Sequence, residues 1–214
     1  MCAAFFGDVE AAKRHLNEMD ERNSDGDTAY TLAAKAGQGT ILELLDPTDE
    51  DGVTALIRAA VRGDVNAVRA LIPLQKGKKM ARDTYINGLR ISSGTALMIA
   101  ATCGHTEVVG LLVEHEGGMQ DDAWWTALMF AAKSGHADCV KLLVEKEAGM
   151  QDKDGRTALM LAAINGHTEC VKLLLERERD MRTTRKWFGY LPGTTALDIA
   201  KREGRIEIVS ILSE

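Results

Sequence analysis

Three histidines recur at one spacing, and they are the first residues whose type could support chemistry. His105, His136 and His167 stand 31 residues apart, and histidine is the commonest metal ligand among the side chains. Packed helices lie about 8–10 Å apart, so equivalent histidines in stacked copies are too distant to share one zinc ion with ligands at about 2 Å. We therefore interpret each histidine as satisfying backbone groups where a helix begins, and we expect neither a metal nor a cofactor.

The four cysteines also argue against catalysis. Cys139 and Cys170 are separated by the same 31 residues, which places their Cα atoms beyond the limit of about 7 Å for a disulfide and predicts small core residues. Cys103 is the one plausible exposed thiol, but no base that could activate it is identifiable beside it. Phosphate-binding loops, dinucleotide fingerprints, zinc-protease motifs and nucleophile elbows are missing from the sequence. The sequence therefore predicts a protein that is not an enzyme.

The histidines belong to a larger internal repeat. Thr-Ala-Leu-Met begins at three threonines, and looser copies begin at three more. A glycine stands nine residues after each threonine, although the distance between copies varies from 26 to 41 residues. A constant spacing inside variable gaps indicates a rigid unit joined by loops of different length. The starting residues are Thr28, Thr54, Thr95, Thr126, Thr157 and Thr195, and Gly7 marks a further half copy.

Each unit has the pattern of two short helices. Threonine is a favourable N-cap, and the Ala-Leu-Met-x-Ala-Ala pattern that follows consists of strong helix formers with small side chains. The glycine allows the left-handed conformation that ends a helix. The second segment, for example Cys170-Val171-x-Leu173-Leu174, carries an apolar stripe at helical spacing. Because one helix pair cannot bury its apolar face alone, the copies must stack into an elongated solenoid.

The best copies resemble the ankyrin repeat. The segment from Asp154 to Leu174 reads DGRTALMLAAINGHTECVKLL, which is similar to the family pattern DGxTPLHxAAxxGHxEVVKLLL. Alanine replaces the usual proline after threonine, methionine replaces the usual histidine, and the period of 31 residues is about two shorter than the family norm. The GMQD element at 118–121 and 149–152 resembles a variant found in some protist ankyrin proteins.

This resemblance implies an all-α fold, an ankyrin-repeat solenoid of six to seven helix-turn-helix units. Short finger loops join the units, and two of these loops are extended. The chain would form a single array over 1–214, with units at roughly 1–24, 25–50, 51–91, 92–121, 122–152, 153–191 and 192–214. The family's mode of binding implies a groove, lined by the first helices and the fingers, that receives a protein.

Three junctions between units depart from the regular length. The gap from Thr54 to Thr95 has ten extra residues and contains the basic stretch Gln75–Asp83, with Lys76, Lys78 and Lys79. The gap after Thr157 has seven extra residues and contains the segment 182–192, RTTRKWFGYLP. We expect both insertions to lie in fingers. The gap after Thr28 shrinks to 26 residues, so we expect its finger nearly to vanish.

The aromatic residues gather outside the expected core and define the candidate binding site. Exposed tryptophan and tyrosine are enriched at interaction hot spots, because they bury a large area at little entropic cost. The alternative is that Trp187 and Tyr190 pack their own loop and that Phe5 and Phe6 close the end of the array. Groove positions at the ends of first helices and the basic residues of the last finger complete the candidate set. It comprises Trp124, Trp125, Trp187, Phe188, Tyr190, Phe5, Phe6, Lys133, Ile164, Asn165, Arg182, Arg185 and Lys186.

Composition limits where the protein acts and what it binds. The formal charge of −6 and the pI near 5.5 argue against a dedicated nucleic-acid or anionic-membrane protein. No apolar run reaches the 18–20 residues needed to span a bilayer, and the first residues lack a basic secretory leader. We expect an intracellular, cytoplasmic protein. The charged runs Glu145–Glu147 and Glu176–Arg179 are interpreted as solvated helix ends.

The leading functional hypothesis is a non-catalytic scaffold that binds a partner protein with an acidic or apolar segment. The basic residues of the extended fingers would steer an acidic partner. One alternative is a targeting array within a larger protein, such as an ankyrin-containing kinase, because both ends lack clearly polar caps. Another is weak nucleic-acid binding by the basic and aromatic fingers, which the acidic net charge disfavours.

Overall fold

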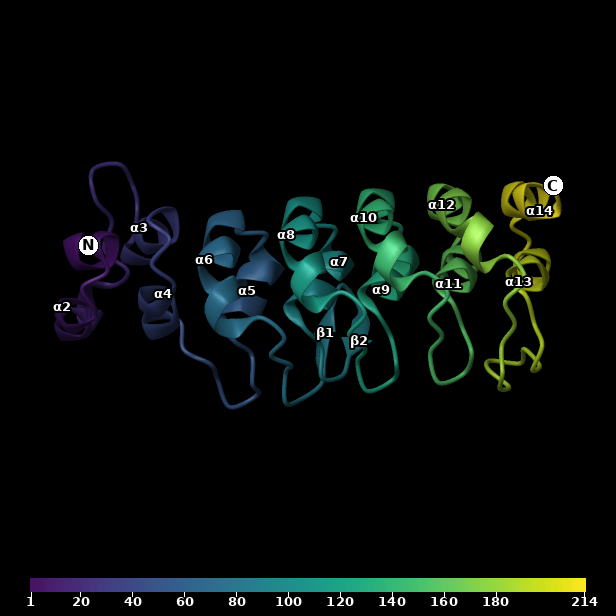
Figure 1. The fold of residues 1–214 in the computed structure, drawn as a ribbon, viewed down its shortest axis with the longest axis horizontal. Helices are drawn as coiled ribbons and strands as arrows, with labels where there is room; N and C mark the ends of the chain where they lie inside the picture. Colours follow the sequence, from purple (N-terminus) through teal and green to yellow (C-terminus); the bar gives the residue numbers. More distant parts are fainter.

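The computed structural model describes residues 1–214 and confirms an all-α repeat solenoid, in which fourteen α-helices follow each other as seven pairs (Figure 1). We call each pair a tier, numbered 1 to 7 from the N-terminus, and name each finger by the two tiers it joins. The helices of tiers 1 to 3 are α1 (Cys2–Phe6) and α2 (Val9–Arg14), α3 (Ala29–Lys35) and α4 (Gly39–Leu45), and α5 (Ala55–Arg62) and α6 (Val65–Gln75). Those of tiers 4 to 7 are α7 (Ala96–Cys103) and α8 (Thr106–Glu116), α9 (Ala127–Ser134) and α10 (Ala137–Glu147), α11 (Ala158–Asn165) and α12 (Thr168–Glu178), and α13 (Ala196–Arg202) and α14 (Ile206–Ser213). A short 3₁₀ helix, η1 (Leu16–Glu18), follows α2.

The threonines and glycines of the repeat bound the first helices as the sequence predicts. The Thr126 hydroxyl accepts a hydrogen bond from the Met129 N–H at 3.4 Å, and the Thr157 hydroxyl accepts one from the Met160 N–H at the same distance. Gly135 ends α9 in the left-handed conformation, with φ of 80°. The repeat therefore encodes the boundaries of these first helices locally, although Thr95 begins α7 without a hydrogen bond from its side chain.

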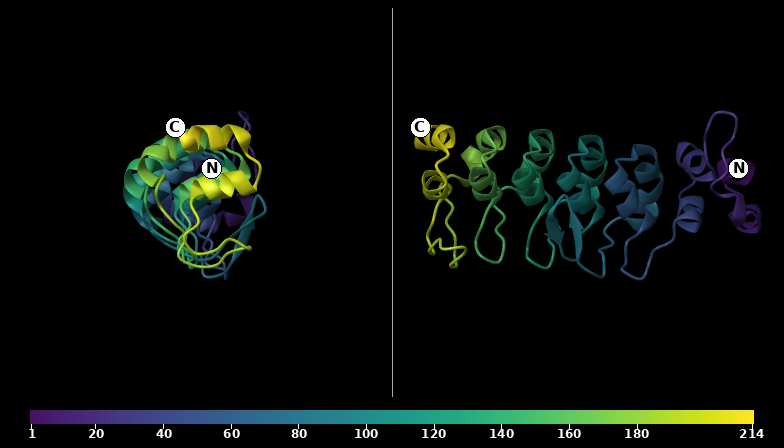
Figure 2. Two further views of the ribbon diagram at one scale, coloured as in Figure 1. Left: turned by 90° about the vertical axis from the view of Figure 1, so that its right-hand side faces the viewer. Right: turned by 180° about the vertical axis from the view of Figure 1, so that it is seen from behind.

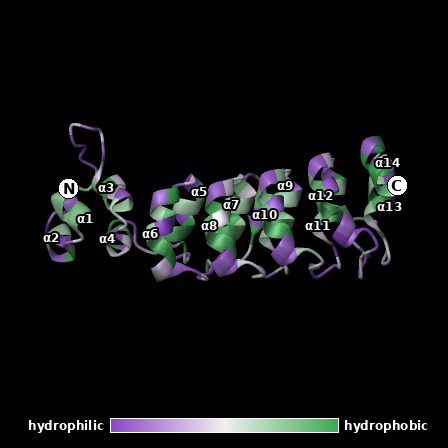
Figure 3. Ribbon diagram, turned by 45° about the horizontal axis from the view of Figure 1, so that its top comes forward, coloured by the Kyte–Doolittle hydropathy of each residue, from purple (hydrophilic) through white to green (hydrophobic).

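One continuous apolar core runs through all seven tiers. Its first-helix residues are largely alanines, which let neighbouring helices approach closely, and its second-helix residues are mainly valine, leucine and isoleucine. Phe130 on α9 is the largest fully buried side chain. Figure 3 shows green, hydrophobic ribbon concentrated on the helices, with purple, hydrophilic positions on their outer turns and along many of the fingers.

Tiers 1 and 2 are turned over relative to tiers 3 to 7. In the later tiers the second helices form one row, and the fingers extend beyond the first helices on the other side (Figures 1 and 2). In tiers 1 and 2 the first helices lie on the side of that second-helix row, and finger 1–2 points the opposite way. The contacts agree, because α3 packs on α6, whereas at every later junction first helix packs on first helix. The predicted stack is therefore continuous, but it turns at junction 2–3.

The shortened unit between Thr28 and Thr54 loses helix rather than finger, so the expectation of a vanishing finger is wrong. Helix α4 has 7 residues, whereas α6, α8, α10 and α12 each have 11. Finger 2–3 keeps its turn, in which the Asp49 carboxylate accepts hydrogen bonds from the N–H groups of Asp51 at 3.0 Å and Val53 at 2.8 Å. Asp121 and Asp152 form the same turn in later fingers. Because this side chain satisfies the backbone donors of the turn locally, the turn survives the deletion.

The two long junctions are extended fingers, as the sequence predicts. Finger 3–4 forms an antiparallel hairpin of β1 (Thr84–Ile86) and β2 (Leu89–Ile91), in which Tyr85 pairs with Arg90. Finger 6–7 closes with a bridge between Trp187 and Tyr190. None of the helices is both long enough and apolar enough to cross a lipid bilayer.

The repeat histidines connect neighbouring tiers. His136 Nε2 lies 3.1 Å from the Thr102 carbonyl of the preceding tier, and His105 and His167 make the equivalent bonds. A carbonyl oxygen only accepts, so Nε2 must carry the proton. The prediction that these histidines bond to backbone groups is thus correct. The group they bond to lies in the preceding tier and not at the start of their own second helix. Gln38 and Arg205 donate in the same way, so only junction 2–3, where Asp64 holds the position, lacks this bond.

A buried glutamate closes the same junctions at the end of the second helix. Glu147 is only 1% exposed, and its carboxylate accepts hydrogen bonds from Gly118 N–H at 2.9 Å and Leu128 N–H at 2.7 Å. Glu116 and Glu178 do the same in tiers 4 and 6. The interpretation of the runs around Glu147 and Glu178 as solvated helix ends is therefore wrong for these two residues. They serve the backbone of two tiers at once.

Burial gives these carboxyls an unusual dependence on pH. Desolvation raises the pKa of Glu147 and of Glu178 above the ordinary value of 4.5, against the opposing effect of the backbone N–H donors. A folded-state pKa above the unfolded value means that the folded state binds the proton more tightly, so stability falls as pH rises through that interval. We expect the stability advantage of the wild type over Glu147→Gln to shrink over the pH range that begins at the ordinary value of 4.5 and extends upward. Urea unfolding of both proteins across this range measures it, and an advantage that grows with pH would contradict the assignment.

Candidate functional site

Alternating cationic and aromatic side chains run across the finger side of tiers 5 to 7. The Lys133 ammonium lies 5.1 Å from the Trp125 ring centroid, and the Arg156 guanidinium lies 5.4 Å from the same ring. Arg156 also lies 4.6 Å from the Trp187 ring, so it stands between two indoles. We call the whole row the cation–aromatic stack, and it consists of Lys133, Trp125, Arg156, Trp187, Tyr190 and Arg202.

Trp125 is part of the core, so its predicted exposure is wrong. Its side chain is 8% exposed, packs on Phe130 with ring centroids 5.0 Å apart, and donates its indole N–H to Asp152 at 3.0 Å. Asp152 also receives the Arg156 guanidinium at 2.5 Å. The tryptophan therefore fixes the base of the stack and presents at most its edge to a partner.

Tyr190 is buried between its own finger and the end of α13, so the alternative interpretation, in which it packs its own loop, is correct only in part. Tyr190 is buried, stacks on Trp187 with ring centroids 5.3 Å apart, and donates its hydroxyl to Glu203. Desolvation and then Glu203 raise the pKa of Tyr190 to about 12. The Arg202 guanidinium covers the ring at 4.3 Å. The predicted exposure of Tyr190 is wrong, whereas Trp187 keeps a half-buried surface.

Lys133 is a half-buried cation without a carboxylate partner. Desolvation, and then the positive charge of Arg156, lower the pKa of Lys133 below its ordinary value of 10.5. The nearest ring is Trp125, which offers a cation only the weak attraction of its π face. Arg156 is already paired with Asp152 and Asp154, so Lys133 is the cation of this group that an added anion would neutralise. The stack therefore favours an acidic ligand.

Two aromatic residues stand at the fingertips with little packing of their own. Trp124 is 53% exposed with φ of 67°, and Phe188 is 85% exposed with φ of 41°. Both angles lie in the left-handed region, which glycine adopts easily and bulky residues rarely do. Gly155, the equivalent of Trp124 one tier later, shows φ of 79°. The exposed aromatics thus occupy positions where the backbone favours glycine, which is a recurrent property of functional sites.

Cations near the fingers are neutralised in the early tiers and free in the later ones. Arg58 pairs with Asp46 and Asp49, and Arg82 pairs with Asp51. The basic stretch after α6 is also engaged, because Lys79 donates to the Gln120 carbonyl at 2.6 Å and Lys78 lies 3.9 Å from Glu43. In tiers 5 to 7 the cations without an ion pair are Lys133, Lys153, Arg179, Arg182, Arg185, Lys186, Lys201, Arg202 and Arg205.

The remaining predicted residues divide between this face and the N-terminal tier. Ile164 and Asn165 end α11, where Ile164 is half-buried and Asn165 is exposed. Phe5 and Phe6 end α1 in the turned-over tiers, 48% and 77% exposed, and form a T-shaped pair with ring centroids 5.2 Å apart. The structure does not bring the phenylalanines together with the stack.

The thiols offer no activated nucleophile. All four cysteines are free, and burial raises the pKa of Cys139 and raises that of Cys170 to about 11. Cys103 is half-buried, and desolvation raises the pKa of its thiol too, so the prediction that it is the exposed cysteine is wrong. The exposed cysteine is Cys2 on α1.

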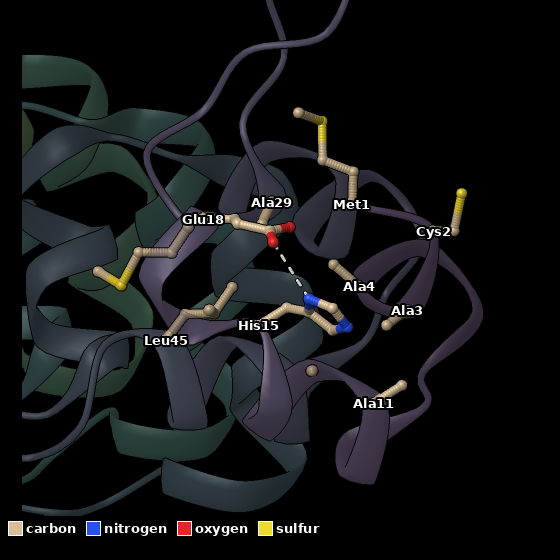
Figure 4. A pocket seen from close by; sticks show the side chains of 11 residues that line it. Met1, Cys2, Ala3, Ala4, Ala11, His15, Glu18, Ala29 and Leu45 are labelled. Atoms are coloured by element: carbon tan, nitrogen blue, oxygen red, sulfur yellow. Dashed lines mark hydrogen bonds and ion pairs between the residues drawn. The ribbon is translucent and has the colours of Figure 1, made fainter.

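An apolar cavity of about 300 Å³ lies between tiers 1 and 2 (Figure 4). Its walls come from α1, α2, η1 and the facing ends of α3 and α4. Ala11, Ala12 and His15 stand here at the positions where tier 4 has two valines and a leucine. The only polar pair at the cavity is His15 Nδ1 with Glu18 at 3.1 Å, drawn as the dashed line in Figure 4. The cavity therefore follows from small side chains at the seam, and it lacks the convergent polar groups of a ligand site.

Sequence reasoning missed Arg156 and Arg202, and the repeat spacing could have found them. Arg156 precedes its threonine as Trp125 precedes Thr126, and equivalent positions in consecutive tiers are neighbours. A tryptophan followed by an arginine at one repeat position therefore predicts a cation over a ring. Arg202 occupies the same repeat position as Lys133, seven residues after the threonine of its unit, two tiers further on.

Comparison with protein families gives one result. A family model of ankyrin repeats, in three copies, matches residues 1–84, 78–151 and 138–214, which together span the chain. No curated protein matches the sequence.

Proposed function

The chain belongs to the ankyrin-repeat family, and we propose that it is a non-catalytic scaffold that binds a partner protein across the fingers and first helices of tiers 5 to 7. Ankyrin repeats are generally protein–protein interaction modules. The observation that carries the proposal is the pair of exposed aromatics, Trp124 and Phe188, on backbone that favours glycine. Both residues cost conformational energy and pack little against the rest of the fold. Such residues are typical of binding sites.

The framework supports the proposal by its rigidity. Each junction from tier 3 onward carries a hydrogen bond between tiers, and in tiers 4 to 6 a buried glutamate joins the second helix to the preceding finger. A preorganised surface lowers the entropic cost of association. The four free cysteines suit a reducing compartment, so we place the scaffold inside the cell, in the cytoplasm.

Site-specific crosslinking tests which face the partner occupies. We expect a photoreactive residue at Asn165, exposed at the end of α11, to crosslink a partner protein in cells. The matched control is the same residue at Lys172, which is exposed on α12 in the second-helix row. Crosslinks from Lys172 with none from Asn165 would move the interface to the opposite face and refute the proposal.

A further inference from the structure

We infer that the partner presents an extended acidic segment with two apolar side chains about five to six residues apart, one for Trp124 and one for Phe188. This inference rests on the proposed function and specifies the chemistry of the partner. It depends on three features of the finger side: the two aromatic fingertips, the free cations between them, and the distance between fingers.

The two fingertips are alike in conformation and exposure. Trp124 belongs to finger 4–5 and Phe188 to finger 6–7, and both hold an aromatic ring in solvent on left-handed backbone. At the position of Trp124, fingers 2–3 and 5–6 have Gly52 and Gly155, each with positive φ. Large aromatic side chains make extensive apolar contacts with a partner at low entropic cost. Each fingertip therefore suits one apolar side chain of the partner.

The exposed charges between the fingertips are mainly positive, although the exposed carboxylate of Asp122 lies in the same finger as Trp124. Lys153, on the intervening finger 5–6, is exposed and makes no ion pair, and Arg185 and Lys186 precede Phe188 without partners. Lys133 adds an unpaired ammonium on the first-helix side of the same surface. The chain as a whole carries a charge of −6, so this positive surface is local. A partner segment rich in aspartate and glutamate complements it.

The geometry of the array sets the spacing of the apolar side chains. Fingers 4–5 and 6–7 are two tiers apart, and packed helices lie about 8–10 Å apart, so the fingertips are separated by about 16–20 Å. An extended chain advances about 3.3 Å per residue, which gives about five to six residues between the two side chains. A helical segment would need about eleven to thirteen residues for the same distance.

An extended conformation also fits the way in which successive fingers are linked. Successive fingers are joined by one or two backbone hydrogen bonds. Lys153 N–H donates to the Ala123 carbonyl at 3.3 Å, and the N–H groups of Thr184 and Arg185 donate to the Asp154 carbonyl at 2.9 Å and 3.2 Å. The row of turns is thus linked edge to edge along the array. An extended peptide can run along this row and meet one finger after another, whereas a helix would touch it along one narrow stripe.

The test uses fluorescein-labelled peptides of about fifteen residues, made of aspartate, glutamate and serine, with two leucines separated by about two to twelve positions. Fluorescence anisotropy with the full chain measures each affinity at low and high salt. We expect the tightest binding at a spacing of five or six, and weaker binding as salt rises. Matched peptides with lysine in place of the acids, and an oligothymidylate, serve as competitors.

The decisive variant is Trp124→Gly, because it separates binding from folding. We expect it to weaken the best peptide at least tenfold, in the range of hot-spot residues. The same change should raise the midpoint of thermal unfolding by about 2–4 °C, because glycine adopts this backbone without strain. The control is Phe6→Ser, which removes an aromatic ring that is 77% exposed in tier 1 and should leave peptide affinity unchanged.

Each outcome decides the inference. An affinity optimum at five or six that Trp124→Gly abolishes supports it. An optimum near eleven to thirteen, no dependence on spacing, or tighter binding of the lysine peptide or the oligothymidylate overturns it. Failure of every peptide while Asn165 still crosslinks a partner would leave the proposed function intact and refute the extended acidic segment.

Discussion

Replacing Glu147 by alanine is expected to lower the free energy of unfolding by about 2–4 kcal/mol. The substitution removes the acceptor of two N–H groups, that of Leu128, which is buried, and that of Gly118, which is partly buried. Each buried donor without a partner costs about 1–3 kcal/mol, and the recovered desolvation energy of the carboxylate offsets part of the sum. Chemical denaturation followed by circular dichroism measures the change.

Glu145→Ala is the matched control, two residues earlier on α10. The Glu145 side chain is 71% exposed and contacts Arg177 at 2.6 Å, and exposed pairs contribute little to stability. We expect the midpoint of unfolding to change hardly at all in this variant. Equal losses from the two substitutions would show that the buried carboxylate does not hold tiers 4 and 5 together.

The substitution Glu147→Gln can be compared with tier 3, where Gln75 already holds the equivalent position. Gln75 in tier 3 accepts the Leu56 N–H at 2.8 Å with its carbonyl oxygen, and its amide donates to Glu43 at 3.0 Å. Glutamine works there because its NH₂ meets a carboxylate. At Glu147 the NH₂ of a glutamine would face an N–H, so two donors would oppose each other. The conservative substitution should therefore also destabilise tier 5, by less than alanine does.

The parts of the fold that the sequence predicts are those encoded within one unit. Thr126 caps a helix and Gly135 ends it through bonds to residues a few positions away. Their spacing can therefore be recognised in the sequence alone. The extended fingers are predictable for the same reason, because additional residues must leave a rigid unit at its loop. The fold class followed from these local signals.

The parts that could not be predicted depend on contacts between units. Glu147 looks like any charged residue at a helix end until the backbone donors of two tiers converge on it. Trp125 stands in a loop segment, yet Phe130 and Asp152 from different parts of the array bury it. In the candidate site, sequence reasoning identified the exposed Trp124 and Phe188 but could not separate them from buried neighbours of the same type. Burial is a property of the assembled array, so composition alone does not reveal it.

The turn at junction 2–3 has the same origin and makes this junction the weak point of the array. The bond that a histidine, glutamine or arginine makes elsewhere is missing, because Asp64 instead accepts the Ala67 N–H at 3.0 Å. Helix α4 ends before the position at which later tiers place a buried glutamate or glutamine. What remains is the packing of α4 and α3 on α6, together with polar contacts between side chains. These are chiefly the ion pairs of Arg58, the hydrogen bond from Gln75 to Glu43 and the hydrogen bond from Arg62 to Tyr30. Tiers 1 and 2 should therefore be able to unfold while the rest stays folded.

Gly39→Ala is expected to release this N-terminal block selectively. A Cβ atom at Gly39 would stand 2.3 Å from the Ala70 carbonyl oxygen of α6, and a backbone atom cannot rotate away as a side chain can. Helix α4 must therefore move off α6, which we expect to cost tiers 1 and 2 about 2–3 kcal/mol of local stability. Hydrogen exchange read by mass spectrometry should show faster exchange over residues 1–45 and unchanged exchange over tiers 5 to 7.

Gly110→Ala is the matched control, because it changes helix propensity as Gly39→Ala does but causes no steric clash. A Cβ atom there would meet only the Leu142 side chain, at 3.8 Å, and alanine in a helix is favoured over glycine by about 0.5–1 kcal/mol. We expect Gly110→Ala to slow exchange in tier 4, the opposite sign to Gly39→Ala. If Gly39→Ala instead accelerated exchange uniformly through tier 7, the array would unfold as one unit and junction 2–3 would transmit stability as well as the others. A selective effect would mean that the binding face of tiers 5 to 7 stays folded when the first two tiers open.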